Sequence, residues 1–217
     1  MAAPMFVIYL FCFLVILLSV LFFRVLYIIF TLGKVKTRNT KSERAMKLLV
    51  VAGSGGHTSE LLRLLGSLSG NYKPRVYVLA NTDKMSCDKV QEFESKKNCE
   101  YSIEIIPRSR EVRQSYLTSI ASTLYATWYA FPLVFRVKPD LVLVNGPGTC
   151  IPVCAASFML RVLGLRTVIQ VYVESICRVE HLSVSGLIMY YFADKLLVQW
   201  PQLVTKYPRA QYIGRIV

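Results

Sequence analysis

A glycine-rich turn with a histidine is the part of this chain best suited to bind an anion. Residues 53–58 read Gly-Ser-Gly-Gly-His-Thr, directly after an apolar run and directly before the helix-like run 59–65. Glycine allows the backbone to come close to a ligand, and the first free N–H groups of a helix point out of its N-terminus. A strand, a glycine turn and a helix N-terminus in this order predict an anion site.

Two further segments place small or acidic residues after apolar runs. Residues 144–149 read Val-Asn-Gly-Pro-Gly-Thr, in which Asn145 is suited to bond a hydroxyl or an amide. Residues 172–178 contain Glu174, whose carboxylate can accept hydrogen bonds from sugar hydroxyls. In the alternative interpretation, the glycines of 144–149 only form a tight turn and Glu174 pairs with Arg178. Three such loops on one edge of a sheet favour the functional interpretation.

Strand and helix patterns alternate along the rest of the chain. We expect strands near 47–52, 75–80, 101–106, 140–144, 166–172, 194–199 and 210–213. We expect helices near 57–69, 85–97, 114–136, 149–163, 182–193 and 200–206. Several strands are continuous apolar runs, which is typical of strands covered by helices on both faces. The pattern predicts an α/β fold, with one Rossmann-like parallel-sheet domain whose ligands bind at the C-terminal ends of its strands.

The glycine turn departs from two common nucleotide-binding motifs. A dinucleotide fingerprint needs a third glycine where this chain has Thr58, and its ribose-binding acid would be Asp83, after the second expected strand. A phosphate-binding P-loop needs a lysine after the glycines, and none follows. A Rossmann oxidoreductase stays as an alternative, ATP hydrolysis is disfavoured, and no cofactor is expected.

The N-terminal segment has the length and composition of a membrane span. From Met5 to Phe23 there is no charged side chain, and at about 1.5 Å per residue the run covers roughly 28 Å, close to a bilayer core. Arg24 ends the run and can reach toward the lipid headgroups. A cleaved signal peptide is the alternative, but no basic segment precedes the apolar run. We therefore assign residues 1–33 to a transmembrane anchor.

Basic residues follow the anchor and predict its orientation. The segment 34–46 is rich in lysine and arginine, with Glu43 as its one acid, and no charged side chain precedes the anchor. The positive-inside rule places everything after residue 33 in the cytosol. We expect 34–46 to be a juxtamembrane linker on anionic headgroups, followed by a domain of residues 47–217.

Composition narrows the class of partner. The formal net charge of +13 suits acidic lipids or phosphates, whereas the anchor and the thinly spread basic residues disfavour nucleic acid. The six cysteines form no CxxC pair, so we expect reduced thiols in a cytosolic domain and no metal site.

The expected helix 114–136 carries a broad aromatic face. Its apolar residues recur at helical spacing around Trp128, and the basic residues Arg113, Arg136 and Lys138 lie at its ends. Such a stripe is most often plain core. Aromatic residues with flanking basic residues also fit a helix that lies in a membrane interface. Both interpretations stay open.

The three loops resemble those of one known enzyme family. GSGGHT (53–58), NGPGT (145–149) and VYVES (171–175) resemble the loops of the N-terminal half of MurG-type glycosyltransferases. Longer motifs are similar to a family of membrane-anchored subunits of eukaryotic transferases: IPRSREV (106–112), VKPDLVLVNGPGTC (137–150) and YIGRIV (212–217). Those transferases add the second N-acetylglucosamine of the dolichol-linked N-glycan precursor.

The resemblance implies half of an enzyme. MurG-type enzymes have a GT-B fold, in which two Rossmann domains enclose the active site and the second binds the UDP-sugar. The likeness covers about residues 46–217 and corresponds to the first, acceptor-binding half. It implies a separate cytosolic donor-binding subunit, which this chain recruits to the endoplasmic reticulum membrane, and no activity alone. The apolar end, Ile216 and Val217, is expected to contact that partner.

The resemblance also implies roles for individual residues. The transfer would be inverting: a base takes the proton of the acceptor's 4-hydroxyl while UDP leaves from the opposite face. His57 matches the family's glycine-loop histidine and is the candidate base or diphosphate ligand. Glu174 matches the family's acid, in a catalytic or sugar-binding role. Binding of the acceptor and its diphosphate falls to Gly53, Ser54, Gly55, Gly56, Thr58, Arg108, Arg110, Asn145, Gly146, Gly148 and Thr149.

A membrane scaffold without catalytic residues is the alternative from a different functional class. In that case the loops carry no chemistry, and the chain acts only by holding its partner. The glycines and the histidine present at the loop positions favour the catalytic interpretation.

Overall fold

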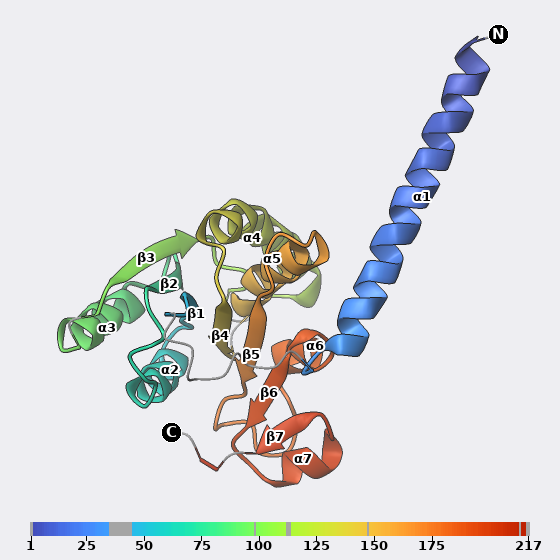
Figure 1. Cartoon of the computed structure of the whole chain (residues 1–217). Helices are drawn as coiled ribbons and strands as arrows, with labels where there is room; N and C mark the ends of the chain where they lie inside the picture. Colours follow the sequence, from blue (N-terminus) through green and yellow to red (C-terminus); the bar gives the residue numbers. More distant parts are fainter. Residues whose placement is uncertain are drawn as a thin grey trace.

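Strands and helices alternate along the chain after a long N-terminal helix, which stands beside them (Figure 1). The coordinates are a computed structural model that describes residues 2–34, 45–97, 99–111, 114–146, 148–212 and 214–215. Most of the expected linker, residues 35–44, lies outside the described residues. The division into 1–33, 34–46 and 47–217 therefore stays a prediction.

One seven-stranded sheet forms the centre of the domain, and every neighbouring pair in it is parallel. The strand order is β3-β2-β1-β4-β5-β6-β7, so the direction of winding reverses between β1 and β4. The strands are β1 Leu48–Val51, β2 Arg75–Ala80, β3 Tyr101–Ile106, β4 Leu141–Asn145, β5 Ile169–Val173, β6 Lys195–Val198 and β7 Ala210–Tyr212. The predicted Rossmann-like sheet is confirmed, with small differences in strand bounds.

Helices cover both faces of the sheet. Those after the first two strands pack on one face, and those after β3, β4 and β5 pack on the other, each over its own buried cluster. The helices are α2 Gly56–Gly66, α3 Lys84–Ser95, α4 Tyr116–Val137, α5 Cys150–Val162, α6 Val184–Phe192 and α7 Gln202–Lys206. Strands β1, β2 and β4 are buried along their whole length, as expected for apolar runs covered on both sides.

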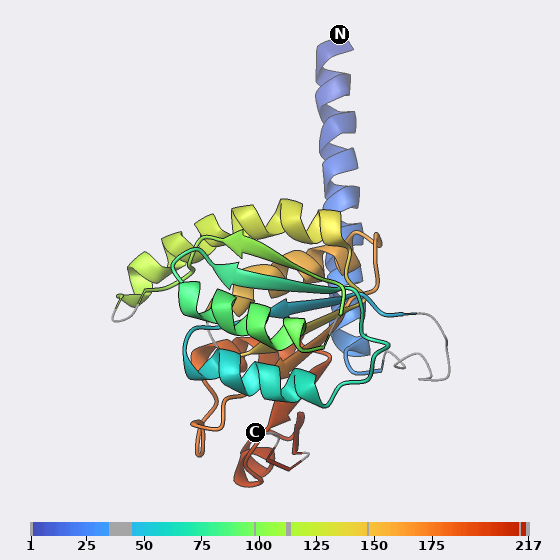
Figure 2. The same ribbon diagram turned by 90° about the vertical axis from the view of Figure 1, so that its left-hand side faces the viewer.

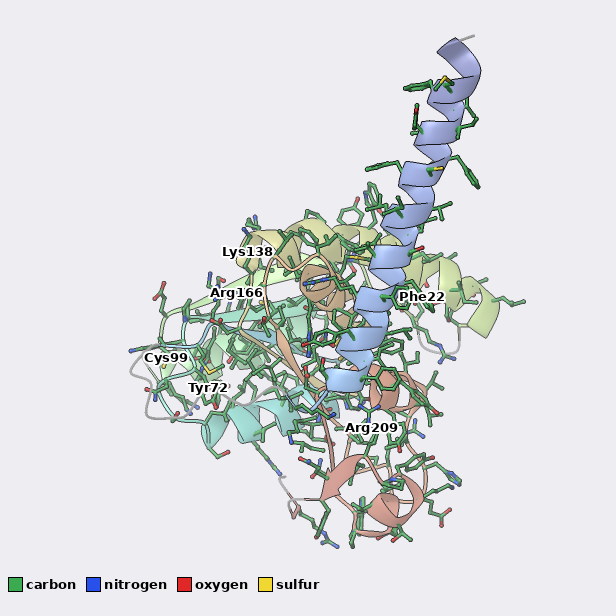
Figure 3. All side chains as sticks on the ribbon, turned by 45° about the vertical axis from the view of Figure 1, so that its right-hand side comes forward. Phe22, Tyr72, Cys99, Lys138, Arg166 and Arg209 are labelled. Atoms are coloured by element: carbon green, nitrogen blue, oxygen red, sulfur yellow. The ribbon has the colours of Figure 1, made fainter. Side chains whose placement is uncertain are left out.

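The N-terminal helix α1, Ala2–Thr31, extends away from the domain (Figure 1). Within its segment Met5–Thr31, the most apolar stretch of 18 residues has a mean hydropathy of 3.1 and none of it is buried, so the helix is long and apolar enough to cross a membrane. Figure 3 shows the side chains of its first turns projecting on all sides of the helix, with no other helix or strand beside them.

Two polar contacts attach the end of α1 to the domain. The Arg24 guanidinium donates to the carbonyls of Arg161 and Val162 at the C-terminal end of α5. The Arg161 carbonyl also accepts from the Gly164 N–H at 3.1 Å, so the arginine adds to the hydrogen bonds that cap the C-terminal end of α5. The Gly33 N–H lies 3.4 Å from the Asp194 carboxylate. Arg24, expected to reach toward headgroups, is thus a contact between anchor and domain.

Asp194 connects four segments of the structure. Its carboxylate pairs with Arg161 Nη1 at 2.8 and 3.0 Å and accepts a hydrogen bond from the Gln170 N–H at 3.0 Å. Together with Gly33, these contacts join α1, α5, β5 and the start of β6. The Asp194 and Arg161 side chains are both nearly inaccessible to solvent. This buried pair holds the anchor side of the domain together.

We expect Asp194→Ala to lower the free energy of unfolding by about 3–5 kcal/mol, because it leaves the Arg161 charge buried and unpaired. Denaturant unfolding of the full chain in detergent measures the change. The control is Lys96→Ala, which breaks the exposed Lys96–Glu92 pair and should have no measurable effect. Equal stabilities for the two variants would contradict the role of Asp194.

Candidate functional site

A cleft of about 460 Å³ opens at the C-terminal edge of the sheet. It lies beside the reversal of strand order between β1 and β4, where open parallel sheets bind ligands. Loops that follow five different strands, β1 to β5, contribute to it. The lining residues are Ala52, Gly53, Ser54, His57, Ala80, Asp83, Arg108, Arg110, Glu111, Gly148, Thr149 and Arg178.

The glycine turn presents a helix N-terminus to this cleft. Gly55 is the N-cap of α2 with φ of 66°, a conformation that favours glycine, and no side chain caps the helix. The first N–H groups of α2, including those of Gly56 and Thr58, therefore have no side-chain partner and suit an anion. The buried Thr58 hydroxyl donates to the Gly53 carbonyl and lies 2.7 Å from the Ser86 hydroxyl, so this side chain supports the turn.

A second helix N-terminus faces the same cleft. Thr149 is the N-cap of α5, which also has no side-chain cap. Gly148 precedes it, and a Cβ built on Gly148 would lie 3.7 Å from Cβ of Arg110. Both loop residues line the cleft, as predicted from the glycine-rich segment after β4.

Arginines add positive charge around the cleft. Arg108 pairs with Glu111 at 3.3 Å, and Arg110 Nη2 donates to the Gln114 carbonyl at 3.2 Å. Arg178, which the sequence analysis considered only as a partner for Glu174, is exposed and lines the cleft as well. Guanidinium groups and helix N-termini together favour a phosphate or diphosphate ligand.

His57 is held at the wall of the cleft. Its Nδ1 lies 2.8 Å from Oδ1 of Asn145, at the end of β4. Gly146 has φ of 70°, and a Cβ there would lie 2.5 Å from the Cε1 atom of the imidazole. A glycine at this position is therefore required by the backbone conformation and by the room that the His57 ring occupies.

A chain of buried hydrogen bonds continues behind His57. Asn145 Nδ2 donates to Glu60 Oε2 at 2.9 Å, and Ser175 Oγ donates to Glu60 Oε1 at 2.8 Å. Asn145, expected to bind a hydroxyl or an amide of the ligand, instead uses its amide on His57 and Glu60. The sequence analysis missed Glu60 and Ser175. The available signal was that Glu60 stands three residues after His57 on a helix, which places both on one face.

Glu174 is placed differently from the expectation that it points into the ligand crevice. Its side chain is 0% exposed, and its carboxylate accepts hydrogen bonds from the Ser183 N–H at 2.8 Å and the Ser175 N–H at 3.2 Å. Ser183 is the N-cap of α6. Burial raises the pKa of the Glu174 carboxyl, against the opposing effect of these hydrogen bonds. This geometry assigns Glu174 to holding the start of α6.

Asp83 lines the cleft from the end of β2. Its Oδ1 accepts from the Ser86 N–H at 3.2 Å and caps α3, while the buried Oδ2 has no hydrogen-bond partner. Within the described part of the chain, no group of three or more His, Cys, Asp or Glu side chains gathers as metal ligands would. Cys154 lies in the core, where burial raises the pKa of its thiol to about 12.

The raised pKa of Glu174 predicts a pH-dependent stability. The folded state holds the Glu174 proton more tightly than the unfolded state, whose carboxyl keeps an ordinary pKa of about 4.5. This contribution is present below that pKa and is lost as the pH rises through the folded-state pKa. We expect Glu174→Gln to flatten this decline in a series of unfolding measurements across pH. An unchanged slope would show that the carboxyl titrates normally.

The comparisons with known proteins agree with this architecture. A family model described as "Oligosaccharide biosynthesis protein Alg14 like" matches residues 48–216. Among solved structures, MurG of Acinetobacter baumannii is similar with a TM-score of 0.51 and 18% identity, covering 72% of this chain. A putative UDP-N-acetylglucosamine 2-epimerase of Listeria monocytogenes is similar with a TM-score of 0.54 and 12% identity, covering 76%. At these identities the likeness concerns the fold alone. The chain spans only 42% of the length of either protein.

Relatives with closer sequences share one name, "UDP-N-acetylglucosamine transferase subunit ALG14". The rat protein is 56% identical over 182 residues, which cover 80% of this chain and 84% of the relative. The human protein is 53% identical over 190 residues, covering 84% and 88%. The Schizosaccharomyces pombe protein is 41% identical over 193 residues, covering 86% and 91%. By the family model and by these identities, the chain belongs to the Alg14-like family of oligosaccharide biosynthesis proteins.

Proposed function

We propose that this chain is the membrane-anchoring, acceptor-binding subunit of a split glycosyltransferase. The enzyme would transfer N-acetylglucosamine from its UDP donor to N-acetylglucosaminyl-diphospho-dolichol. The observation that carries the proposal is the cleft itself, in which two uncapped helix N-termini, arginines and His57 converge in a chain with an apolar N-terminal helix. The relatives named as transferase subunits support the same reaction.

The acceptor fits this cleft through its diphosphate. The N–H groups at the starts of α2 and α5, with Arg108 and Arg110, offer charge and hydrogen bonds to the diphosphate oxygens. The sugar would then extend toward His57, and the polyprenyl chain would leave toward the bilayer. No metal takes part in this proposal, because the arginines and helix N-termini supply the positive charge.

A separate cytosolic subunit would bring the UDP-sugar. The shared name of the relatives includes the word subunit, which supports a second chain in the enzyme. The C-terminal residues Ile216 and Val217, expected to contact this partner, lie outside the described residues. They follow β7, an edge strand of the sheet with Tyr212 half exposed. An edge strand with unpaired backbone groups supports a partner at this end of the sheet.

The reaction is proposed to be a direct, inverting displacement. His57 Nε2 takes the proton of the acceptor's 4-hydroxyl as that oxygen forms a bond to C1 of the donor sugar. The bond from C1 to the UDP oxygen breaks on the opposite face, and UDP leaves with its electron pair. A neutral imidazole is suited to accept this proton near neutral pH. Glu174, buried under α6, acts through the fold rather than on the sugar.

The helix α4 is proposed to lie on the membrane surface. It crosses the side of the domain from which α1 rises, at a steep angle to α1 (Figure 2). Its outer side chains are exposed although they are apolar, including Leu117 at 82% and Trp128 at 78%. Exposed apolar side chains on this scale mark a contact with lipid or protein. The opposite face of α4 packs into the core. We therefore propose that one face of the helix is core and that the other contacts the membrane interface.

The proposed location is the cytosolic face of the endoplasmic reticulum membrane, with a single membrane span. The span α1 and the basic segment after it support this orientation. The alternatives are a scaffold whose cleft carries no chemistry and a dinucleotide-dependent oxidoreductase. The second is disfavoured because the buried Thr58 stands where a dinucleotide fingerprint needs its third glycine.

We expect His57→Ala to reduce transfer by about 100-fold or more, the usual size of general-base catalysis, while the partner subunit still co-purifies. Transfer of labelled N-acetylglucosamine by the assembled enzyme is the measurement. His181→Ala is the matched control, because this exposed histidine lies outside the cleft and should leave activity intact. Full activity of His57→Ala with a retained partner would favour the scaffold alternative.

The chain without residues 1–33 is expected to retain binding to anionic liposomes through α4, measured by flotation. Trp128→Glu should weaken this binding because it places a charge in the lipid-facing side of the helix. Met85→Glu is the control, since Met85 is 70% exposed, close to the value for Trp128, but lies on α3 at the other face of the sheet. A truncated chain that stays free of liposomes would contradict the membrane contact.

A further inference from the structure

We propose that Asn145 and Glu60 are positioning residues that hold His57 in the tautomer with its proton on Nδ1. Nε2 then keeps its lone pair and is the proton acceptor at the cleft. The inference rests on the proposed function, since it concerns the same histidine. It adds two residues that do not line the cleft and that act only through His57.

Glu60 sets the direction of the hydrogen bonds. An ionised carboxylate only accepts, and its two oxygens receive the Asn145 amide at 2.9 Å and the Ser175 hydroxyl at 2.8 Å. Ser175 Oγ also accepts from the Cys177 N–H at 3.4 Å, and its own proton points to Glu60. The opposite rotamer of Asn145 would place Oδ1 against Glu60 Oε2, two acceptors facing each other. The amide nitrogen of Asn145 therefore faces Glu60.

The orientation of the Asn145 amide also fixes the direction of its hydrogen bond with the His57 imidazole. With Nδ2 turned to Glu60, Asn145 presents Oδ1 to His57 Nδ1 at 2.8 Å. A carbonyl oxygen only accepts, so Nδ1 must carry the proton. In a neutral imidazole with its proton on Nδ1, Nε2 holds the free electron pair. The Glu60 carboxylate, on the far side of Asn145, thus determines which nitrogen of His57 can take a proton.

Burial protects the hydrogen bonds of Asn145, Glu60 and Ser175 from exchange with water. Asn145 is 1% exposed, Glu60 7% and Ser175 4%, so water has little access to replace any of these bonds. The three residues come from β4, from α2 and from the end of β5, which the core holds in place. Gly146 adds a steric limit, because the ring lies where a Cβ would be.

The second histidine provides an internal reference. The chain contains two histidines, His57 and His181. Nδ1 of His181 lies 2.6 Å from Lys206 Nζ, and an ammonium group only donates. His181 Nδ1 must therefore accept, and its proton belongs on Nε2. The two neutral rings are expected in opposite tautomers.

Nitrogen-15 NMR of the full chain, labelled at histidine and held in detergent micelles, tests the assignment directly. The spectra are recorded as a series of increasing pH, and the tautomer is read where the imidazole signals no longer change with pH. A His181→Gln variant assigns the signals. We expect the proton on Nδ1 in His57 and on Nε2 in His181.

Two isosteric substitutions separate positioning from packing. Glu60→Gln offers either an oxygen or an NH2 group to Asn145, so the amide can turn over and His57 should become a mixture of tautomers. Adding Asn145→Asp restores a single direction, because the new carboxylate accepts from both the new amide and His57 Nδ1. We expect the mixture in Glu60→Gln and a return to Nδ1–H in the double variant.

Transfer by the assembled enzyme should follow the tautomer. We expect Glu60→Gln to lower kcat by about 2- to 10-fold, since kcat scales with the fraction of reactive rings, and the double variant to recover most of the loss. The KM for the acceptor should stay within about 2-fold, because neither residue touches it. Ser175→Ala leaves the Glu60 carboxylate facing Asn145 and should keep both the tautomer and kcat, while the spectra of the parent chain test the assignment without any substitution.

Different results would overturn the positioning proposal and the proposal that His57 is the base. A parent chain with the proton on Nε2 of His57, or a double variant no better than Glu60→Gln in both tautomer and kcat, overturns the positioning proposal. Full activity of His57→Ala overturns the proposed base itself, whatever tautomer the spectra show.

Discussion

The parallel pairing of β1 with β4 is the contact on which the rest of the structure depends. Leu48 to Val51 run beside Leu141 to Val144, buried under helices on both faces, although the two strands lie far apart in the sequence. Because their C-terminal ends meet at one edge, the glycine turn lies beside Asn145 and the His57 ring reaches its amide at 2.8 Å. The reversal of strand order at this point also opens the cleft between the two helix N-termini.

The same domain is proposed to stand against a bilayer. Arg24 caps α5, and Asp194 joins the end of α1 to α5 and β5, so the spanning helix is attached by polar contacts to one side of the sheet. The helix α4 covers that side with exposed apolar residues (Figure 2). The loop with Arg108 and Arg110 leads into α4 and lines the cleft. In the proposed function, a lipid-linked diphosphate would meet the apolar helix first, then the cationic loop and then the cleft.

The sheet could be predicted from the sequence because its strands are continuous apolar runs separated by helical patterns, and this periodicity depends on local chemistry. The glycine turn and the loop after β4 could be placed for the same reason. The direction in which buried polar side chains point could not be predicted from the sequence. Glu174 turns to the start of α6, and Glu60 and Ser175 complete the bonds of Asn145, because partners from distant segments decide where a buried polar group points. The roles of Ile216 and Val217 remain predictions.

Transfer of labelled N-acetylglucosamine from UDP to N-acetylglucosaminyl-diphospho-dolichol tests the central claim most directly. The assay compares the detergent-solubilised chain alone, the cytosolic donor-binding subunit alone, and the two mixed. The account predicts transfer only in the mixture, since this chain supplies the acceptor cleft and half of a GT-B site. Transfer by this chain alone would contradict the split site. An inactive mixture of correctly assembled subunits would mean that the cleft binds a different anion.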